Sequence, residues 1–243
     1  YFSSKKKADE INDKLVTKGF KSAVYHADLE LTERFLVQQQ FLNDQLDVIC
    51  ATSAFGMGIN KPNIRYVIHY HMPNDLEAYV QEIGRCSRDG RPGIAVLLYE
   101  PSDLKRQEFL IEKTLPNSQQ IKYFIKHQEL LQNFASEETQ LLARLLANGY
   151  RKDQIETLVK KRQTERNDAL QKMYQYLKTG SCKRQFIAQY FGDKIENVHS
   201  SDTCCGADQA PPLEKLGLLG ESVVRADGKK EQDYREILQQ LFK

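Results

Sequence analysis

The chain has 243 residues, enough for one large domain or two small ones, and its formal net charge at pH 7 is only +2. No apolar run reaches the roughly 18 residues of a membrane span, and five cysteines, an odd number, do not make a disulfide framework. Composition therefore excludes a membrane-spanning or disulfide-stabilised class and predicts a reducing compartment, and any nucleic-acid partner would depend on local basic patches.

Residues 1–103 alternate between helical and strand patterns, which predicts an α/β domain. Helices are expected over 5–18, 32–43 and 75–88, and buried parallel strands over 22–26, 47–51, 66–70 and 94–99. On the helix 32–43, the pattern places Leu36 and the pair Phe41-Leu42 on the inner side.

Polar residues and glycines stand at the ends of two of these strands, where parallel sheets collect ligands. His26 ends the first strand, and Thr52 and Ser53 follow the second. Gly56 and Gly58 come next, and glycines there allow backbone N–H groups to approach a phosphate or ribose closely. A tight turn needs the same residues, so the two glycines alone do not decide between a turn and a nucleotide site.

The helix expected over 75–88 carries a second polar pattern. Gln81, Arg85 and Arg88 have helical spacing and are expected on one face, with Gly90 as the stop signal. Two guanidiniums and an amide on one face suit an anionic partner, because arginine presents a planar fork of donors to phosphate oxygens. The alternative is a solvated basic face without a ligand.

These segments together closely resemble a known family. Residues 51–61, with the run Ala-Phe-Gly-Met-Gly-Ile-Asn-Lys, and residues 81–90, Gln-Glu-Ile-Gly-Arg-Cys-Ser-Arg-Asp-Gly, resemble motifs V and VI of the RecQ family of DNA helicases. Shorter matches occur at Tyr1–Ser4 (the end of motif IV), Tyr25–Leu29, Ile59–Asn63, Val67–Tyr70 and Tyr190–Gly192. The resemblance covers most of residues 1–103 and returns at 180–205.

The resemblance implies an ATP-dependent 3′–5′ DNA helicase of repair and recombination, located in the bacterial cytoplasm and nucleoid. Such proteins bind ATP and Mg²⁺ between two RecA-like domains and act on single-stranded DNA and duplex junctions. The first domain carries a phosphate loop and an acidic box, and neither Gly-x4-Gly-Lys-Thr nor Asp-Glu-x-His occurs in this sequence. The chain, which opens in mid-strand, is therefore expected to be a fragment that pairs with its own N-terminal RecA-like domain and is inactive alone.

The same resemblance assigns roles to individual residues. Arg88 matches the arginine finger, with Arg85 and Gln81 as its neighbours in the catalytic group. The residues expected near the nucleotide are Asn60, Gly56 and Gly58, and those expected near the DNA backbone are His26, Thr52 and Ser53. Asp28 replaces the usual glycine of the family, and a carboxylate beside a phosphate path is unfavourable.

Beyond the α/β domain, composition changes. We expect the second RecA-like domain over 1–103, a helical extension over 104–170, a zinc-binding module over 171–211, and a linker and tail over 212–243. Spacing within 104–178 predicts three or four short helices and then a longer one over 153–178. The extension is either a brace packed on the α/β domain or a contact surface for DNA or a partner. The basic residues Lys160-Lys161-Arg162 and Arg166 would favour the contact surface.

The zinc prediction rests on spacing. Family members place four cysteines as Cys-x16-Cys-x2-Cys-x2-Cys, and the positions here are Cys182, His199, Asp202 and Cys205. Histidine and aspartate both ligate zinc, so a structural Zn²⁺ is expected. Cys204 is an alternative to Asp202, and the alternative to the whole site is a degenerate module without metal.

Two other functions fit the sequence in part. An RNA helicase would share the architecture, but motif V and the zinc-type spacing do not resemble DEAD-box proteins. A non-catalytic DNA-binding or scaffold protein would keep the fold without activity, and the intact Gln81, Arg85 and Arg88 argue against it.

Overall fold

The computed structural model describes residues 1–56, 59–133, 136–193, 213 and 216–218. The chain forms two compact units, the first made of Tyr1–His71, Val80–Tyr99 and the residues from Ser181 onward, the second of Met72–Tyr79 and Glu100–Gly180. Among the residues that the structure describes, no helix is long and apolar enough to cross a membrane.

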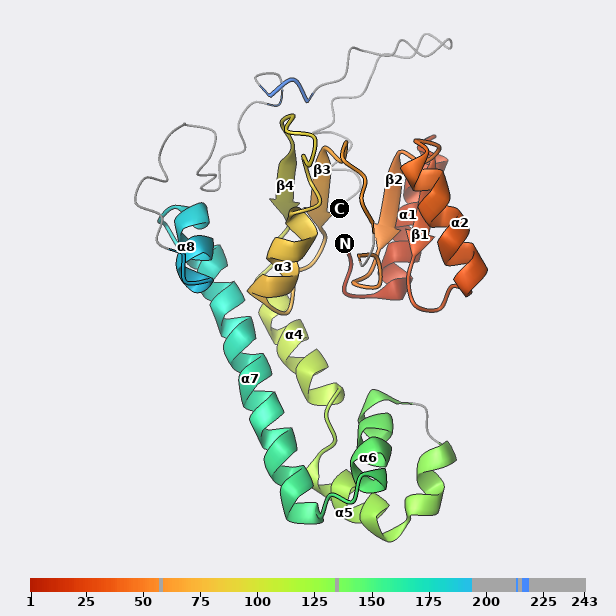
Figure 1. Cartoon of the computed structure of the whole chain (residues 1–243), viewed down its shortest axis with the longest axis vertical. Helices are drawn as coiled ribbons and strands as arrows, with labels where there is room; N and C mark the ends of the chain where they lie inside the picture. Colours follow the sequence, from red (N-terminus) through yellow and green to blue (C-terminus); the bar gives the residue numbers. More distant parts are fainter. Residues whose placement is uncertain (57–58, 134–135, 194–212, 214–215, 219–243) are drawn as a thin grey trace. The chain divides into compact units, whose positions relative to one another are not determined.

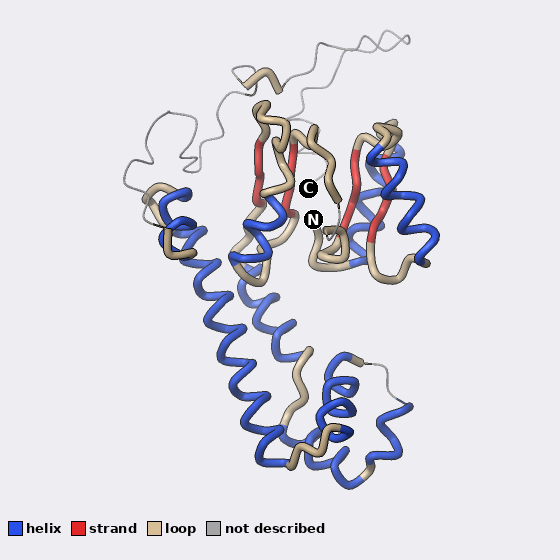
Figure 2. The backbone as a smooth tube through the Cα atoms, viewed as in Figure 1, coloured by secondary structure: helices blue, strands red, loops and turns tan. Residues whose placement is uncertain are grey.

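The first unit contains two pairs of parallel strands (Figures 1 and 2). Its elements are α1 (Lys5–Thr17), β1 (Ser22–Tyr25), α2 (Leu31–Leu42), β2 (Val48–Ala51), β3 (Tyr66–His69), β4 (Ile94–Leu97) and α8 (Lys183–Tyr190). β1 pairs with β2, and β3 pairs with β4. All four predicted strands are present, and the α/β prediction is confirmed.

The first two residues of the chain join the two strand pairs. The main-chain nitrogen of Tyr1 donates to Ile68 O at 2.5 Å, and Tyr1 O accepts from the Tyr70 nitrogen at 2.9 Å. On the other side, the Phe2 nitrogen donates to Ala51 O at 2.8 Å. Residues 1–2 therefore occupy a strand-like position between β2 and β3.

The helices cover these strands through a few buried side chains. The α1 residues Ala8, Ile11 and Leu15 pack with Cys50 of β2. α2 contributes Phe41, whereas Leu36, which was predicted on the inner side, is 58% exposed. Five residues correspond to a rotation of about 140° around a helix, so Leu36 and Phe41 cannot face the same sheet.

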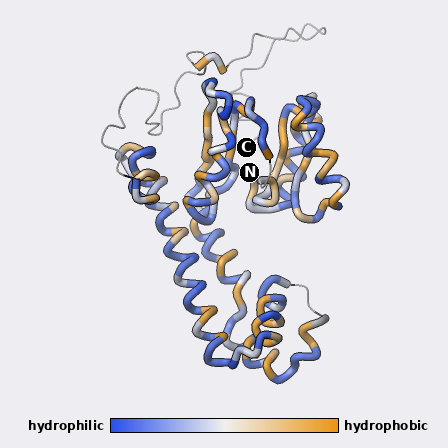
Figure 3. Tube along the Cα trace, in the orientation of Figure 1, coloured by the Kyte–Doolittle hydropathy of each residue, from blue (hydrophilic) through white to orange (hydrophobic). Residues whose placement is uncertain are grey.

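The second unit is helical. It contains α4 (Ser102–Lys113), α5 (Ser118–Lys126), a 3₁₀ helix (Gln128–Asn133), α6 (Glu137–Ala147) and α7 (Lys152–Lys178). The prediction of short helices followed by one long helix is confirmed. Figure 3 shows α7 as mainly hydrophilic with short hydrophobic bands, and its buried residues Ile155 and Val159 pack with Ile121, Phe124 and Leu142 of α5 and α6.

One predicted helix is wrong at its end. α3 comprises Leu76–Ile83. Asp75, the residue before it, accepts a hydrogen bond at Oδ1 from the Ala78 nitrogen at 2.6 Å. Its apolar side is Leu76 with Tyr79, both buried. The predicted helix to residue 88 is replaced after Ile83 by a turn, so Gln81, Arg85 and Arg88 do not share a helix face.

Contacts to the segment before β3 explain why α3 ends. We call residues 84–90 the arginine turn. Within it the Ser87 nitrogen donates to Ile64 O at 2.9 Å, and the Asp89 nitrogen donates to Pro62 O at 3.2 Å. These donors are therefore not available for helical bonds to the fourth preceding carbonyl. Ser87 also has a positive φ of 60°, which a helix excludes.

Gly93, at the start of β4, packs directly against the arginine turn. A Cβ atom added at Gly93 would lie 2.1 Å from Ser87 Oγ and 2.5 Å from Cys86 Sγ. The Cys86 thiol itself points at main-chain oxygens, with Arg65 O at 3.3 Å. The turn and the strand are thus packed so closely that the position between them has room for glycine alone.

We therefore expect Gly93→Ala to destabilise the first unit by about 1–3 kcal/mol, the usual cost of overpacking a tight contact. Gly180→Ala is the matched control, because a Cβ there has no neighbour within 4 Å. Urea unfolding of both variants measures the difference. Equal midpoints for the two variants would contradict the tight packing of Gly93.

Candidate functional site

Arg88 is held at the surface by uncharged acceptors. Its Nη1 donates to Ile59 O at 3.2 Å and to Asn60 Oδ1 at 3.1 Å, and its Nε donates to Gly84 O at 3.2 Å. The side chain is exposed, and in the described part of the chain it makes no ion pair. Its positive charge is therefore fixed in position and not neutralised by a carboxylate.

Arg65 shows the opposite arrangement in the same region. Its guanidinium forms an ion pair with Asp89 and also reaches Arg91 O at 3.4 Å. The Arg65 guanidinium lowers the pKa of the exposed Asp89 carboxyl to about 2. This pair joins the arginine turn to the residue before β3. Asp89 is the acidic residue of the turn, and because it pairs with Arg65, no acidic residue of the turn remains for Arg88.

Arg85 is buried, with only 6% of its surface exposed. A Cβ added at Gly56 would lie 2.8 Å from Arg85 Nη2, so the glycine makes room for this guanidinium against the loop after β2. Arg85 Nε has no hydrogen-bond partner, and Arg85 makes no ion pair within the described ranges. Because an uncompensated buried cation is costly, the site is suited to an anion.

The sequence did not predict a cluster formed by Tyr1, His69 and Glu82. The ring of Tyr1 stacks on that of His69, with centroids 5.3 Å apart, and His69 Nε2 lies 2.7 Å from Glu82 Oε2. Burial lowers the pKa of His69, and the neighbouring Glu82 carboxylate opposes this shift. Burial raises the pKa of the Tyr1 hydroxyl to about 12, against the charge and hydrogen bond of Arg85. His69 was matched to the family within Val67–Tyr70, but nothing in the sequence showed what it contacts.

The predicted DNA-contacting residues lie at the ends of β1 and β2. The Thr52 nitrogen donates to Tyr25 O at 3.1 Å, so the two ends are adjacent. Ser53 is exposed, whereas His26 is only 7% exposed and its Nε2 lies 3.1 Å from Asp9 Oδ1. The His26 imidazole is therefore used inside the fold.

Asp28, in the loop between β1 and α2, forms an ion pair with a lysine. Lys5 Nζ lies 2.5 Å from Asp28 Oδ1, and this partner lowers the pKa of the exposed Asp28 carboxyl. Both side chains are largely exposed, so solvent screens this ion pair.

Most residues of the predicted zinc site lie outside the described part of the chain, as does Gly58. Of its ligand candidates, the described part includes Cys182 and leaves out His199, Asp202, Cys205 and the alternative Cys204. Cys182 is buried and caps α8, where its Sγ accepts from the Gln185 nitrogen at 3.4 Å. A helix N-terminus favours a thiolate, the form that ligates zinc. No group of three or more ligands occurs among the described residues.

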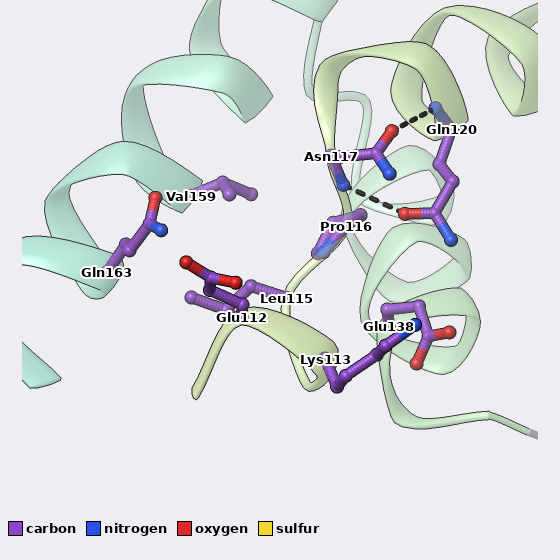
Figure 4. A pocket seen from close by; sticks show the side chains of 9 residues that line it. All are labelled: Glu112, Lys113, Leu115, Pro116, Asn117, Gln120, Glu138, Val159 and Gln163. Carbon is purple, nitrogen blue, oxygen red and sulfur yellow. Dashed lines mark hydrogen bonds between the residues drawn. The ribbon is translucent and has the colours of Figure 1, made fainter. Parts of the chain in front are cut away.

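A separate hollow of about 390 Å³ lies in the second unit (Figure 4). It is lined by Glu112, Lys113, Leu115, Pro116, Asn117, Gln120, Glu138, Val159 and Gln163. Asn117 and Gln120 hydrogen-bond each other's backbones at 2.9 Å and so close the start of α5. These amides have a structural use, and the hollow contains none of the predicted site residues.

Two family models match the chain. The helicase conserved C-terminal domain matches residues 1–90, and the RecQ zinc-binding family matches residues 101–208. The first match agrees with the parallel α/β fold and includes the arginine turn. The second includes helices α4 to α8 together with all the candidate zinc ligands.

Relatives match over most of the chain. A probable ATP-dependent DNA helicase RecS of Bacillus subtilis (strain 168) is 36% identical, over 84% of this chain and 45% of that protein. The ATP-dependent DNA helicase RecQ of Pasteurella multocida (strain Pm70) is 41% identical, over 90% of this chain and 27% of that protein. The chain thus spans less than half the length of these relatives. Among solved structures, the C-terminal domain of the DEAD-box protein Dbp5 is 24% identical with a TM-score of 0.38, over 46% of this chain and 66% of that one.

The buried His69 predicts a pH dependence of stability. Because its pKa is lowered in the fold, the unfolded chain takes up the proton first as the pH falls below about 6.5. The free energy of unfolding is therefore expected to fall as the pH is lowered from 7 through about 6.5. Urea midpoints across this range, for the wild type and for His69→Gln, test the assignment. An equal slope in the variant would show that another group causes the loss.

Proposed function

The chain belongs to the RecQ family of DNA helicases, and we propose that it supplies the second half of the ATP site of a 3′–5′ DNA helicase. The first half would come from the N-terminal RecA-like domain of the full-length protein, and the chain alone would not hydrolyse ATP. The observation that carries the proposal is the exposed Arg88 guanidinium, oriented by neutral acceptors and without an acidic partner in the described part of the chain.

Arg88 would act as the arginine finger. ATP would supply the phosphoryl group that is transferred to water, with Mg²⁺ held mainly by the N-terminal domain. The contacts to Ile59 O and Asn60 Oδ1 orient the Arg88 guanidinium before any nucleotide arrives. A prepositioned positive charge stabilises the negative charge that develops during phosphoryl transfer, which is how such arginines raise the rate.

The neighbouring residues would complete the nucleotide side of the site. Arg85, which lacks a carboxylate partner among the described residues, would place a second positive charge behind the loop, and Gly56 would keep room for it. Asn60 would lie near the ribose while orienting Arg88, and Gln81 would contribute its exposed amide from α3. Gly58 belongs to the same loop in the proposal.

The DNA side of the site would be formed by the loop ends of β1 and β2. Thr52 would contact the DNA backbone through its hydroxyl, since its main-chain nitrogen donates to Tyr25 O, and Ser53 would do so through its main-chain nitrogen and hydroxyl. His26 would act through Asp9, holding the end of β1 in place. Because the nucleotide loop continues directly from Thr52, movement at the ATP would reach the DNA through one short segment. We propose single-stranded DNA and duplex junctions as substrates, in repair and recombination in the bacterial cytoplasm and nucleoid.

The zinc-binding part would be structural. Two cysteines, a histidine and an aspartate form a complete tetrahedral set, which leaves no open position for a reacting water. Cys182, His199, Asp202 and Cys205 would hold the ion. We propose domain limits of 1–103, 104–170, 171–211 and 212–243 for the helicase domain, the helical extension, the zinc module and the tail.

In the full-length protein, Arg88→Ala is expected to lower DNA-stimulated ATP turnover at least about a hundredfold, because the charge on the transferring phosphoryl group loses its partner. Binding of single-stranded DNA should stay within about twofold, since Arg88 is assigned to the nucleotide. ATP hydrolysis with and without DNA, and fluorescence anisotropy of labelled DNA, are the measurements.

Arg91→Ala is the matched control. Arg91 is an exposed arginine three residues away, so the variant removes the same charge. DNA-stimulated ATP turnover should be close to that of the wild type in this control. Equal turnover in wild type and Arg88→Ala would refute the arginine finger, and absence of turnover in the wild type would favour the non-catalytic scaffold.

The purified chain is expected to contain about one zinc ion, measured by elemental analysis. Removing the metal, or Cys182→Ala, should increase hydrogen exchange over residues 171–206 and leave 1–103 protected, because the small module depends on its ion. Cys204→Ser should retain the metal and Asp202→Ala should lose it; the reverse would make Cys204 the ligand. A metal-free chain with unchanged exchange would rule out the site.

A further inference from the structure

We propose that Asp44, in the turn between α2 and β2, is a positioning residue for Arg88. Its carboxylate accepts hydrogen bonds from Lys61 and Asn63 and so holds the acceptor segment, residues 59–63, which carries the acceptors of the Arg88 guanidinium. This inference rests on the proposed function, because it assigns a supporting residue to the same site. All of these residues belong to the first unit.

The backbone conformation at Asp44 is one that favours glycine. Asp44 follows the C-cap of α2 and has a positive φ of 57°. Its nitrogen donates to Phe41 O at 3.3 Å, and the Gln45 nitrogen donates to Gln40 O at 2.9 Å. This pair of bonds ends many helices, and the left-handed position within it is usually occupied by glycine, which has no Cβ to clash. An aspartate there indicates that the carboxylate has a use that glycine could not supply.

The carboxylate binds a lysine whose side chain is almost fully buried. Lys61 Nζ lies 2.5 Å from Asp44 Oδ1, and only 7% of the Lys61 side chain is exposed, against 69% for Asp44. Asn63 Nδ2 donates to the same oxygen at 3.2 Å. The Lys61 ammonium also lies 5.2 Å from the centroid of the Phe41 ring. Because a buried ammonium without a partner is costly, Lys61 is held at this carboxylate although Asp44 itself is exposed to solvent.

Fixing Lys61 also fixes the residue before it. Ile59 and Lys61 are both buried, whereas Asn60 between them is exposed. Ile59 belongs to the same buried cluster as Phe41, so the acceptor segment is anchored on both sides of Asn60. Between these anchors, Ile59 O and Asn60 Oδ1 accept from Arg88 Nη1 at 3.2 Å and 3.1 Å. The direction of the Arg88 guanidinium therefore depends on the link between Asp44 and Lys61.

The test compares Asp44→Gly with Asp44→Asn in the full-length protein. Both new residues tolerate a positive φ, but only asparagine keeps an Oδ1 acceptor for Lys61. We expect Asp44→Gly to lower kcat for DNA-stimulated ATP hydrolysis about tenfold, with KM for ATP changed less than about twofold, because a misdirected Arg88 is felt mainly in the transition state. Asp44→Asn should restore kcat to within about threefold of wild type, which a role of the charge alone would not allow.

Two further variants complete the comparison. Lys61→Met removes the ammonium and keeps an unbranched side chain over Phe41, so it should lower kcat by a factor similar to Asp44→Gly. Glu10→Ala is the matched control, because Glu10 is also an exposed carboxylate paired with lysines, on α1, and its kcat should equal that of wild type. A kcat within twofold of wild type for Asp44→Gly, or equal losses in Asp44→Gly and Glu10→Ala, would overturn the proposal.

Arg88→Ala is the background that separates this inference from the proposed function. In this background Asp44→Gly should cause no further loss of turnover, because Asp44 acts through Arg88. A further tenfold loss would show that Asp44 acts by another route and would overturn the proposal. If Arg88→Ala by itself keeps full turnover, the proposed function fails. If Arg88→Ala loses turnover and Asp44→Gly does not, only the role of Asp44 fails.

Discussion

The position of both arginines depends on how the arginine turn is attached to the segment before β3. Four contacts make the attachment: Ser87 N to Ile64 O, Asp89 N to Pro62 O, the Arg65–Asp89 ion pair, and Arg88 to Ile59 O. If the helix continued past Ile83, neither of the two backbone bonds could form, because the Ser87 and Asp89 nitrogens would donate to carbonyls of the helix itself. The end of α3 is thus determined by tertiary contacts, and these contacts carry the guanidiniums to the loop after β2.

The attachment also separates the charges of the site. Asp89 is the acidic residue of the turn, and its pairing with Arg65 keeps it away from Arg88. Arg88 is left with carbonyl and amide acceptors, which orient its guanidinium without neutralising it. One ion pair therefore contributes to the packing of the turn and to the positive potential beside it.

Periodicity predicted most elements of this fold, because strands and helices with one apolar face are local patterns. It failed where distant residues decide. The spacing of Gln81, Arg85 and Arg88 is helical, yet Ser87 adopts a positive φ to reach Ile64. The family resemblance identified the arginines but not the contacts among Tyr1, His69 and Glu82, which lie in separate segments of the sequence. The spacing of the four candidate zinc ligands could be recognised in the sequence, whereas three of these candidates lie outside the described residues.

Residues 1–2 have two roles that cannot be separated. Their main chain links β2 to β3, and the Tyr1 hydroxyl donates to Phe55 O in the loop after β2. The loop after β2 is therefore held at Phe55 by a residue whose main chain also joins the two strand pairs. A substitution that weakens the pairing of Phe2 with Ala51 should therefore loosen both the junction of the strand pairs and the loop after β2.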